Sequence, residues 1–386
     1  MRVKELSKKA NERLDINYIR QFGIQSYGED NLYPQTLRQI VKASPTGSEC
    51  FERFADFIEG NGFRDVPFSE YVVNRKGDTV DDIHEAVCRD MALYNGFALH
   101  VNYNTDGKIV EMHHVPFENC RLVDEDSNGY VGKVAIHPDW SGKKVRATKP
   151  IKVDKEHIDF IDVFNPRKEV VMAQIERASG VEYYKGQILW VSGSGRNVYP
   201  VGKADRVATE LSTDEGLANV KYRNVRNNFF PAGIMVTRKA SMFDRGDKII
   251  DEGDFQEVIK QMQGDTNASK ILEVQIETDE EKPEFIEMNS KNYDKEFTAT
   301  ETSVTERIYS AFGQEPWYCI RIGRIGFSGD ILRDAFDYYN SLVGKQQRMI
   351  ERVFTRLFDN WYEVANNSGD YSVQPLIYVN NAAISD

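Results

Sequence analysis

The chain has 386 residues and a formal net charge of −12, with 40% hydrophobic and 28% charged residues. These values are typical of a folded protein with two or three domains, and they exclude a disordered chain. They also exclude a protein that binds nucleic acid over its whole surface, because such proteins neutralise phosphates with Lys and Arg side chains spread over that surface. Local basic groups on an acidic body would instead suit weak, reversible contact with nucleic acid.

Few features of the sequence indicate a membrane, a metal or a cofactor. It has no run of about eighteen apolar residues, and its charged start lacks the apolar stretch of a signal peptide, so we expect a soluble protein made in a cytoplasm. The four cysteines are scattered without a C-x-x-C pair, which favours buried thiols over zinc or disulfides. His113 and His114 would point to opposite faces of a strand, so we expect no shared metal.

The first hundred residues predict helices followed by a hairpin. Residues 17–62 carry a helical pattern with an irregular lead-in at residues 27–35 and a glycine stop at Gly60. Residues 79–92 predict a helix whose first residue, a Thr, suits a cap. Residues 97–116 then alternate on either side of an Asn-Thr-Asp-Gly turn, which predicts a β-hairpin.

From residue 119 to residue 192 the pattern indicates short strands separated by prolines and glycines. We therefore expect the first half of the chain to be an α+β unit, with a β-rich part packed against the N-terminal helices.

A pair of helices far apart in sequence is predicted next. Residues 205–228 carry only a thin apolar line, which indicates a helix buried by its neighbours, and residues 293–312 predict a second helix that stops near Gly313 and Pro316. Residues 229–288 between them should form a small α+β insert, with a helix at 254–264. The apolar positions are Val207, Leu211, Leu217 or Ala218 and Val225 in the first helix, and Phe297, Val304, Ile308 and Phe312 in the second.

The last long element is a proline-free pattern over residues 330–361, with Gly344 in its middle where a kink would be easiest. Residues 371–381 indicate a short strand-like end. The apolar face predicted for the long helix consists of Ile331, Ala335, Leu342, Met349, Val353 and Leu357.

A glycine-rich stretch, IRIGRIGFSGD, precedes this helix and is the main candidate site. Gly323, Gly326 and Gly329 are spaced as G-x-x-G-x-x-G and follow a helix, whereas a dinucleotide site needs G-x-G-x-x-G after a strand. A phosphate loop of the Walker type is excluded because no Gly-Lys-Ser/Thr follows. A nucleotide-binding enzyme that uses this loop stays the alternative function, and a flexible loop with solvated arginines is the structural alternative.

The third interpretation is a loop that reaches into a channel. Arg321 and Arg324 would contact a nucleic-acid backbone without sequence preference, while the glycines permit movement. Ser328 could cap the following helix with its hydroxyl. This interpretation requires a channel, which a ring of subunits can supply.

Other constellations are weaker. The SGSG stretch at residues 192–195 is the nearest thing to a nucleophile turn, and a plain loop explains it better. Lys221, Arg223 and Arg226 lie at the end of the first long helix and define a basic face. We expect this face to be solvated or salt-bridged between subunits, with DNA contact as the sharper alternative.

Four stretches, in this order along the chain, resemble the portal proteins of tailed bacteriophages. Residues 91–123 resemble the family's hairpin, 188–211 the entry to its first stem helix, 222–235 the Asn run and Pro-x-Gly of the turn from stem to clip, and 292–317 the second stem helix. Each motif alone is degenerate, and their order is what carries the resemblance.

The resemblance implies an α+β portal fold with an α/β wing, a two-helix stem, a small α+β clip, a long kinked helix and a short crown. Mapped onto this chain, it places the channel or tunnel loop at residues 314–330. The other parts would be the wing at 1–203, the stem helices at 204–228 and 293–313, the clip at 229–292, the kinked helix at 331–360 and the crown or tail at 361–386.

The resemblance also implies a function without catalysis. The family forms a ring, usually dodecameric, at one capsid vertex, through which double-stranded DNA passes without sequence selection. The implied partners are further copies of the chain, the large terminase, a head-tail adaptor, and the major capsid and scaffold proteins, in the virion or in the host cytoplasm during assembly. No catalytic residue, metal, cofactor or membrane is expected.

Overall fold

The computed structural model describes residues 14, 16–127, 129–142, 145–146, 149–150, 153–194, 198–227, 234–238, 272–276, 293–326 and 328–378. The chain divides into two compact units, residues 1–211 with 306–386 and residues 212–305. Within the described ranges, no helix combines the length and apolar content needed to cross a membrane.

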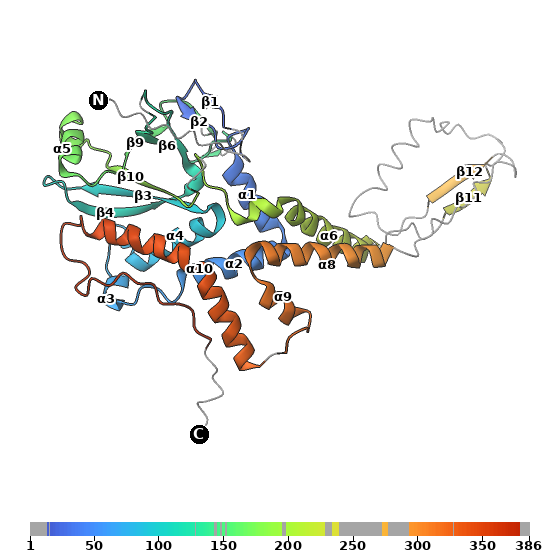
Figure 1. Ribbon diagram of the computed structural model, residues 1–386. Helices are drawn as coiled ribbons and strands as arrows, with labels where there is room; N and C mark the ends of the chain where they lie inside the picture. Colours follow the sequence, from blue (N-terminus) through green and yellow to red (C-terminus); the bar gives the residue numbers. More distant parts are fainter. Residues whose placement is uncertain are drawn as a thin grey trace, which may run out of the picture. The chain divides into compact units, whose positions relative to one another are not determined.

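The first unit is built around a six-stranded mixed sheet with the order β4-β3-β10-β9-β6-β5 (Figure 1). The α+β class predicted from the sequence is therefore confirmed. The strands are β3 (Gly96–Tyr103), β4 (Ile109–Val115), β5 (Cys120–Leu122), β6 (Lys133–Ile136), β9 (Asp159–Val163) and β10 (Gln187–Ser192).

The β3–β4 hairpin confirms the prediction for residues 97–116. The two strands pair antiparallel, and Gly107 takes a positive φ of 74° in the turn. The side-chain oxygen of Asn104 accepts hydrogen bonds from the backbone N–H groups of Asp106, at 3.0 Å, and Lys108, at 2.9 Å. These side-chain-to-backbone hydrogen bonds stabilise the turn and are the local reason why the chain reverses direction here.

One pair of strands in the sheet, β9 and β10, is parallel. Parallel neighbours need a crossover connection, and here it contains helix α5 (Lys168–Arg177). The sequence predicted mostly short strands between residues 119 and 192, and this helix between two of them was not identified. Only Val171 and Ile175 of α5 are buried, so its apolar pattern was too short to be recognised as a helix.

The N-terminal helices begin later than the sequence indicated. Residues 18–25 form a two-stranded ribbon, β1 (Tyr18–Ile19) and β2 (Ile24–Gln25), before α1 (Tyr33–Ala43) and α2 (Pro45–Glu59). The helical assignment of residues 17–26 was therefore wrong, whereas the irregular lead-in expected at residues 27–35 is found up to residue 32. The stop at Gly60 is confirmed, because this residue has a φ of 65° and ends α2.

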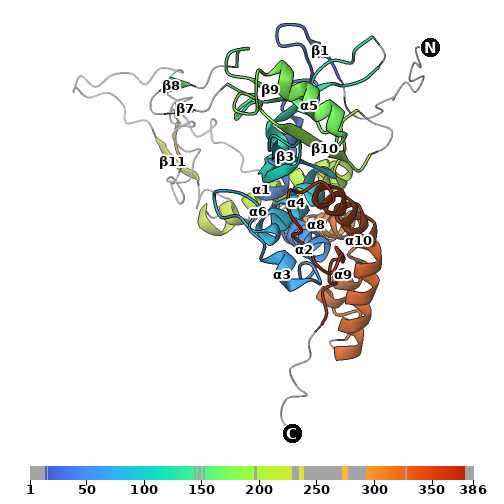
Figure 2. The same cartoon turned by 90° about the vertical axis from the view of Figure 1, so that its left-hand side faces the viewer.

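Helix α4 (Val80–Tyr94) begins at the predicted cap. The hydroxyl of Thr79 accepts a hydrogen bond from the backbone N–H of Asp82, and the Asp82 carboxylate accepts one from the Thr79 backbone. Helix α4 packs on β3 and β4, and α2 packs on α4 (Figures 1 and 2). Two short segments complete this region, α3 (Val66–Ser69) and the 3-10 turn η2 (Lys203–Val207).

Helix α10 (Gly329–Phe358) is the long helix predicted from the proline-free pattern, and it bends along its length (Figures 1 and 2). Its buried face is one residue away from the predicted one at three positions, because Val343, Ile350 and Phe354 are buried in place of their predecessors. Aromatic side chains, which the predicted face left out, make part of this packing. Phe354 contacts Phe63, with ring centroids 5.0 Å apart, and Tyr339 contacts Phe57, at 4.8 Å.

The segment after α10 lies along the same helices. The backbone of Gln374 accepts a hydrogen bond from Asn61 and donates one to Gly62, and Val373 forms a β-bridge with Phe63. Trp361 forms another bridge, with Ile109 of edge strand β4. The described part of the predicted strand-like end, residues 371–378, thus makes a single bridge instead of a strand.

The predicted helix pair consists of α6 (Ala208–Asn227) and α8 (Tyr293–Phe312). Leu211 of α6 is fully buried, as are Ile308 and Phe312 of α8, which confirms the predicted faces at these positions.

In the second unit, β11 (Ile234–Arg238) pairs parallel with β12 (Leu272–Ile276), and the helix predicted at residues 254–264 lies outside the described residues. The short ribbon β7 (Val145–Arg146) and β8 (Lys149–Pro150) completes the strands described.

Candidate functional site

The candidate loop is shorter than the sequence indicated. Residues 315–321 of the expected loop at 314–330 form a helix, α9 (Glu315–Arg321). Gly313, with a φ of 73°, ends α8, and Pro316 then occupies the first turn of a new helix, where its missing N–H costs nothing. The loop proper consists of residues 322–328.

Gly323 ends helix α9, and its role is now clear. It has a φ of 70°, its N–H donates to the Ile320 carbonyl at 3.1 Å, and the next N–H, of Arg324, donates to the Cys319 carbonyl at 2.9 Å. This pair of bonds is the Schellman motif, in which glycine is favoured because its φ is positive. Gly323 therefore terminates a helix and does not cradle a phosphate.

Ser328 begins helix α10, as predicted. Its hydroxyl accepts a hydrogen bond from the Ile331 N–H at 3.3 Å. Gly329 is the first residue of the helix, and Gly326 has open space where a side chain would be. The loop is thus held at both ends by helix caps, and its middle is exposed.

Arg321 is engaged within its own chain. Its guanidinium donates to the Tyr309 hydroxyl at 3.2 Å, stacks over the Tyr309 ring and lies 3.5 Å from the Glu49 carboxylate. The hydrogen bond to Tyr309, followed by the charge of Glu49, raises the pKa of Arg321. The side chain is half exposed, so it could contact a phosphate only in addition to these partners or by leaving them.

Arg324 lies in the exposed middle of the loop. Its backbone is fixed by the Schellman bond, and among the described residues its side chain makes no ion pair or hydrogen bond. The two arginines predicted to act together are therefore different. Arg321 is tied to α2 and α8, whereas Arg324 is the one that presents its charge to solvent.

Gln314 anchors this region, and the sequence analysis did not identify it. The side chain is fully buried, its Nε2 donates to the Cys50 carbonyl at 2.7 Å and the Tyr339 hydroxyl at 2.9 Å, and its Oε1 accepts from Arg53 at 2.7 Å. It thus joins the corner between α8 and α9 to α2 and α10. The one signal in the sequence was its place directly after the glycine stop.

The predicted basic face on α6 is described in part. Lys221 forms an ion pair with Glu301 of α8 in the second unit, which accounts for its charge within one chain. Arg223 and Arg226 belong to the same helix, and their side chains lie outside the described residues. In the first unit, Arg307 of α8 pairs with Glu210 of α6 at 3.1 Å.

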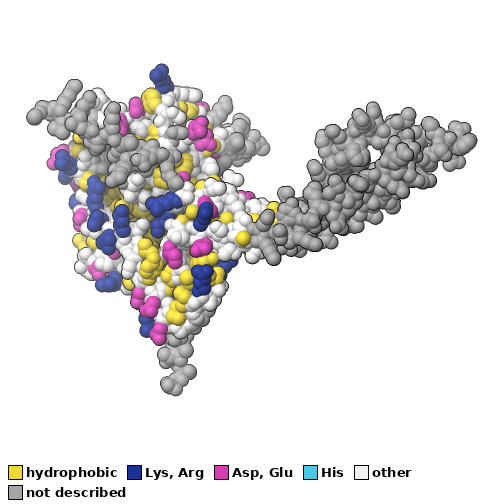
Figure 3. All heavy atoms as spheres, turned by 45° about the vertical axis from the view of Figure 1, so that its right-hand side comes forward, with side chains coloured by type: hydrophobic (Ala, Val, Ile, Leu, Met, Phe, Trp, Pro, Cys, Tyr) yellow, Lys and Arg dark blue, Asp and Glu magenta, His cyan; other side chains and the backbone are white. Residues whose placement is uncertain are grey.

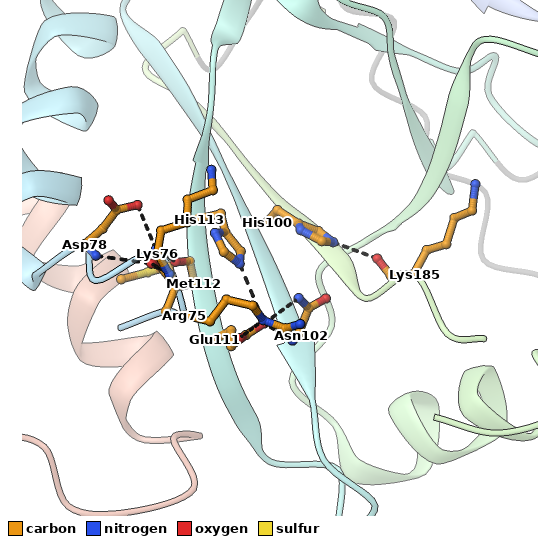
Figure 4. A network of polar contacts seen from close by, with 10 residues as sticks. Arg75, Lys76, Asp78, His100, Asn102, Glu111, Met112, His113 and Lys185 are labelled. Carbon is orange, nitrogen blue, oxygen red and sulfur yellow. Dashed lines mark hydrogen bonds and ion pairs between the residues drawn. The ribbon is translucent and has the colours of Figure 1, made fainter. Parts of the chain in front are cut away.

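A polar cluster on the β3–β4 hairpin also gathers ionisable groups (Figure 4). Arg75 donates to both oxygens of Glu111, at 2.8 and 3.2 Å, and Asn102 donates to one of them at 3.2 Å. The hydrogen bond from Arg75 holds the pKa of Glu111 below its usual value. Since its oxygens are already satisfied, this carboxylate ties a turn to the hairpin and is poorly suited to acid–base catalysis.

The histidines follow the predicted geometry. His113 lies 3.7 Å from Glu111 on one face of β4, while His114 contacts Asp90 of α4 at 2.7 Å on the other. Among the described residues, no group of three or more His, Cys, Asp or Glu side chains could hold a metal ion. Cys50, Cys88 and Cys120 are buried free thiols, and Cys319 is partly buried.

The nucleophile-like SGSG stretch behaves as a loop in the part that is described. The Ser192 hydroxyl donates to the Ser194 carbonyl at 3.2 Å, and the Gly193 N–H donates to the Asn95 carbonyl at 2.8 Å. Gly195 lies outside the described residues.

Comparisons with known proteins give structural matches only. No protein-family model matches the chain, and no curated protein matches it. It is similar to a chain in the neck of a native gene transfer agent (GTA) particle computed with C12 symmetry, at 15% identity over 86% of this chain and 81% of that one, with a TM-score of 0.47. A chain in the neck of an empty GTA particle, computed with C6 symmetry, matches at 14% identity over 96% and 87%, with a TM-score of 0.46.

An HK97 family phage portal protein from Corynebacterium diphtheriae also matches, at 8% identity over 71% of this chain and 75% of that one, with a TM-score of 0.32. The matches thus cover most of the chain. All three TM-scores are below 0.5.

Proposed function

We propose that this chain is the subunit of a portal ring, a conduit for double-stranded DNA at the vertex of a phage-like particle. The order of the four portal-like stretches in the sequence supports this proposal. The observation that carries it is the loop at residues 322–328, which follows the α6–α8 pair and α9, precedes the long bent helix α10, and exposes Arg324.

The electrostatics suit transport more than capture. The chain carries a net charge of −12, and both acidic and basic side chains occur on the face drawn in Figure 3. A chain with a net negative charge repels phosphates, and one exposed arginine per subunit, Arg324, would hold them only weakly, so that DNA could slide past. Contact with phosphates alone carries no sequence preference.

The partners follow from the proposed role. The chain forms a ring with further copies of itself, and twelve is the subunit number to test first. The ring binds the large terminase, a head-tail adaptor, and the major capsid and scaffold proteins. Hydrolysis of ATP belongs to the terminase in this scheme. The ring resides in the virion, and its subunits assemble in the host cytoplasm.

The alternative, a nucleotide-binding enzyme that uses the glycine loop, is disfavoured by the local structure. The loop follows helix α9, whereas dinucleotide sites place their glycines directly after a strand. Gly323 is accounted for by helix termination and Gly329 by its place in α10.

The first test is the mass of the purified protein by light scattering, with negative-stain imaging of the same sample. Rings with a central hole support the proposal. A chain that stays monomeric with its scaffold and capsid partners present, and that binds nucleotide, would overturn it in favour of the enzyme.

The loop itself is tested by Arg324→Glu in a packaging assay. Arg321→Glu is a poor probe because it would place a carboxylate beside Glu49 and disturb the fold. Arg177→Glu, at the exposed end of α5, makes the same change of charge away from the loop. We expect both variants to form rings and only Arg324→Glu to package less DNA, and normal packaging by it would refute phosphate contact by the loop.

A further inference from the structure

A cavity of about 160 Å³ lies in the first unit, where the end of α4, the segment that contains η2 and the middle of α10 meet. It has room for several water molecules or one small oxyanion. Its polar lining comes from Asn95, Lys203, Arg206, Lys345 and Gln346.

The charge of this lining is entirely positive. Lys203 and Arg206 come from η2 and Lys345 from α10, and none of the three forms an ion pair with any side chain that the structure describes. Burial and then the charge of Arg206 lower the pKa of Lys203 to about 8, although Glu315 acts in the opposite direction. Like charges gathered in a half-buried site are unfavourable unless an anion joins them.

The ammonium of Lys203 is held in place. Its Nζ lies 3.9 Å from the centroid of the Phe54 ring, which is the distance of a cation–π contact. The flexible side chain is thereby fixed at the cavity wall, so less freedom is lost when a ligand binds.

Two glycines of the lining allow close approaches that no other residue would permit. A Cβ on Gly202 would lie 1.9 Å from the Leu93 carbonyl oxygen, and one on Gly193 would lie 2.2 Å from the Asn95 side-chain oxygen. Asn95 itself ends α4 in the left-handed conformation, with a φ of 58°. The backbone beside the cavity is thus closely packed at these positions.

Gln346 adds an unsatisfied polar group. Its Oε1 is buried without a hydrogen-bond partner among the described residues. Rotation of the amide by half a turn exchanges oxygen and nitrogen and would place an N–H donor at the same point. Buried polar atoms normally have partners, so this orphan indicates a ligand or water that completes the site.

We propose that this cavity binds a phosphate group, with Lys203, Arg206 and Lys345 as its charged donors. The size fits one tetrahedral oxyanion, and the excess of donors over acceptors fits no cation. The phosphate comes either from free inorganic phosphate or from the backbone of DNA that reaches the cavity mouth. The inference is independent of ring formation.

The test is isothermal titration of the full chain at low salt, with inorganic phosphate in one series and a short DNA duplex in another. The variants are Lys203→Met, which removes the ammonium over Phe54 and leaves an apolar side chain of similar length, and Lys345→Met, which changes an exposed residue. Arg348→Met removes the same charge from α10 outside the cavity lining and is the matched control.

We expect phosphate to bind the wild-type chain. Its affinity should fall at least about tenfold in Lys203→Met and severalfold in Lys345→Met, and it should be unchanged in the control. Duplex binding with the same dependence on Lys203, in the absence of phosphate binding, would identify DNA as the source. If Lys203→Met does not fold, Lys345→Met alone decides. Equal affinities in all variants, or no binding of either probe, would overturn the proposal.

Discussion

The buried side chain of Gln314 offers a direct test of what holds the candidate loop in place. Gln314→Ala removes three hydrogen bonds, to the Cys50 carbonyl, the Tyr339 hydroxyl and the Arg53 guanidinium. A hydrogen bond contributes about 1 kcal/mol net, and more when one partner is charged. Tyr339 keeps its bond to the Phe312 carbonyl and Arg53 keeps Glu49, so neither partner is left wholly unsatisfied.

We therefore expect Gln314→Ala to lower the free energy of unfolding by about 3 kcal/mol. The matched control is Gln347→Ala, whose side chain donates one hydrogen bond, to the Phe57 carbonyl at 3.0 Å, and which should cost about 1 kcal/mol.

Urea unfolding followed by tryptophan fluorescence measures both variants. Trp317 of α9 is a suitable reporter because its ring packs 5.0 Å from that of Tyr339. A shift of the midpoint at constant slope would report stability alone. The reasoning is refuted if Gln314→Ala loses no more stability than the control.

Three further predictions concern single residues. Gly323→Ala should cost about 1 kcal/mol in thermal unfolding through its φ of 70° alone, because nothing lies within 4 Å of an added Cβ. Thr79→Ala should cost about 1 kcal/mol by the loss of the cap of α4, and Thr79→Ser should restore most of it in the same melts. The pKa of Glu59 is raised by burial from 4.5 to about 7, so the folded state retains a proton that the unfolded chain releases between these values. Stability should therefore fall as the pH rises from about 5 to about 7, and Glu59→Gln should flatten this part of the curve, whereas an unchanged slope would contradict the assignment.

Much of the helical framework could be predicted because its signals are local. Each signal works through residues next to it in the sequence. Examples are the glycine that ends α8, the Thr that caps α4 and the Asn of the hairpin turn. The second helix of the predicted pair was therefore placed at its observed bounds, residues 293–312.

The misses have a common physical cause, which is that the deciding contact lies far away in sequence. Helix α5 exists because β9 and β10 pair parallel, and α9 packs its tryptophan against α2. Arg121 is the clearest case, since it reads as an ordinary strand cation and is in fact fully buried, with hydrogen bonds to the side chain and carbonyl of Asn31, about ninety residues away.

In the candidate loop, the sequence showed the spacing of the glycines but not that Gly323 ends one helix and Gly329 begins the next. A sequence pattern treats Arg321 and Arg324 alike. Only the positions of Tyr309, more than ten residues away, and of Glu49, more than two hundred residues away, separate them.

The segment after α10 has a consequence for how the chain folds as it is made. A Cβ on Gly60 would lie 2.0 Å from the Gln374 carbonyl, Phe63 bridges Val373, and edge strand β4 meets Trp361 through Ile109. Protein synthesis delivers the N-terminal partner of each contact hundreds of residues before the other. Until the last part of the chain is made, Phe63 therefore lacks its contacts with Phe354 and Val373, and Ile109 of the edge strand lacks Trp361. A chaperone that covers these positions during synthesis would reduce the risk of pairing with other chains.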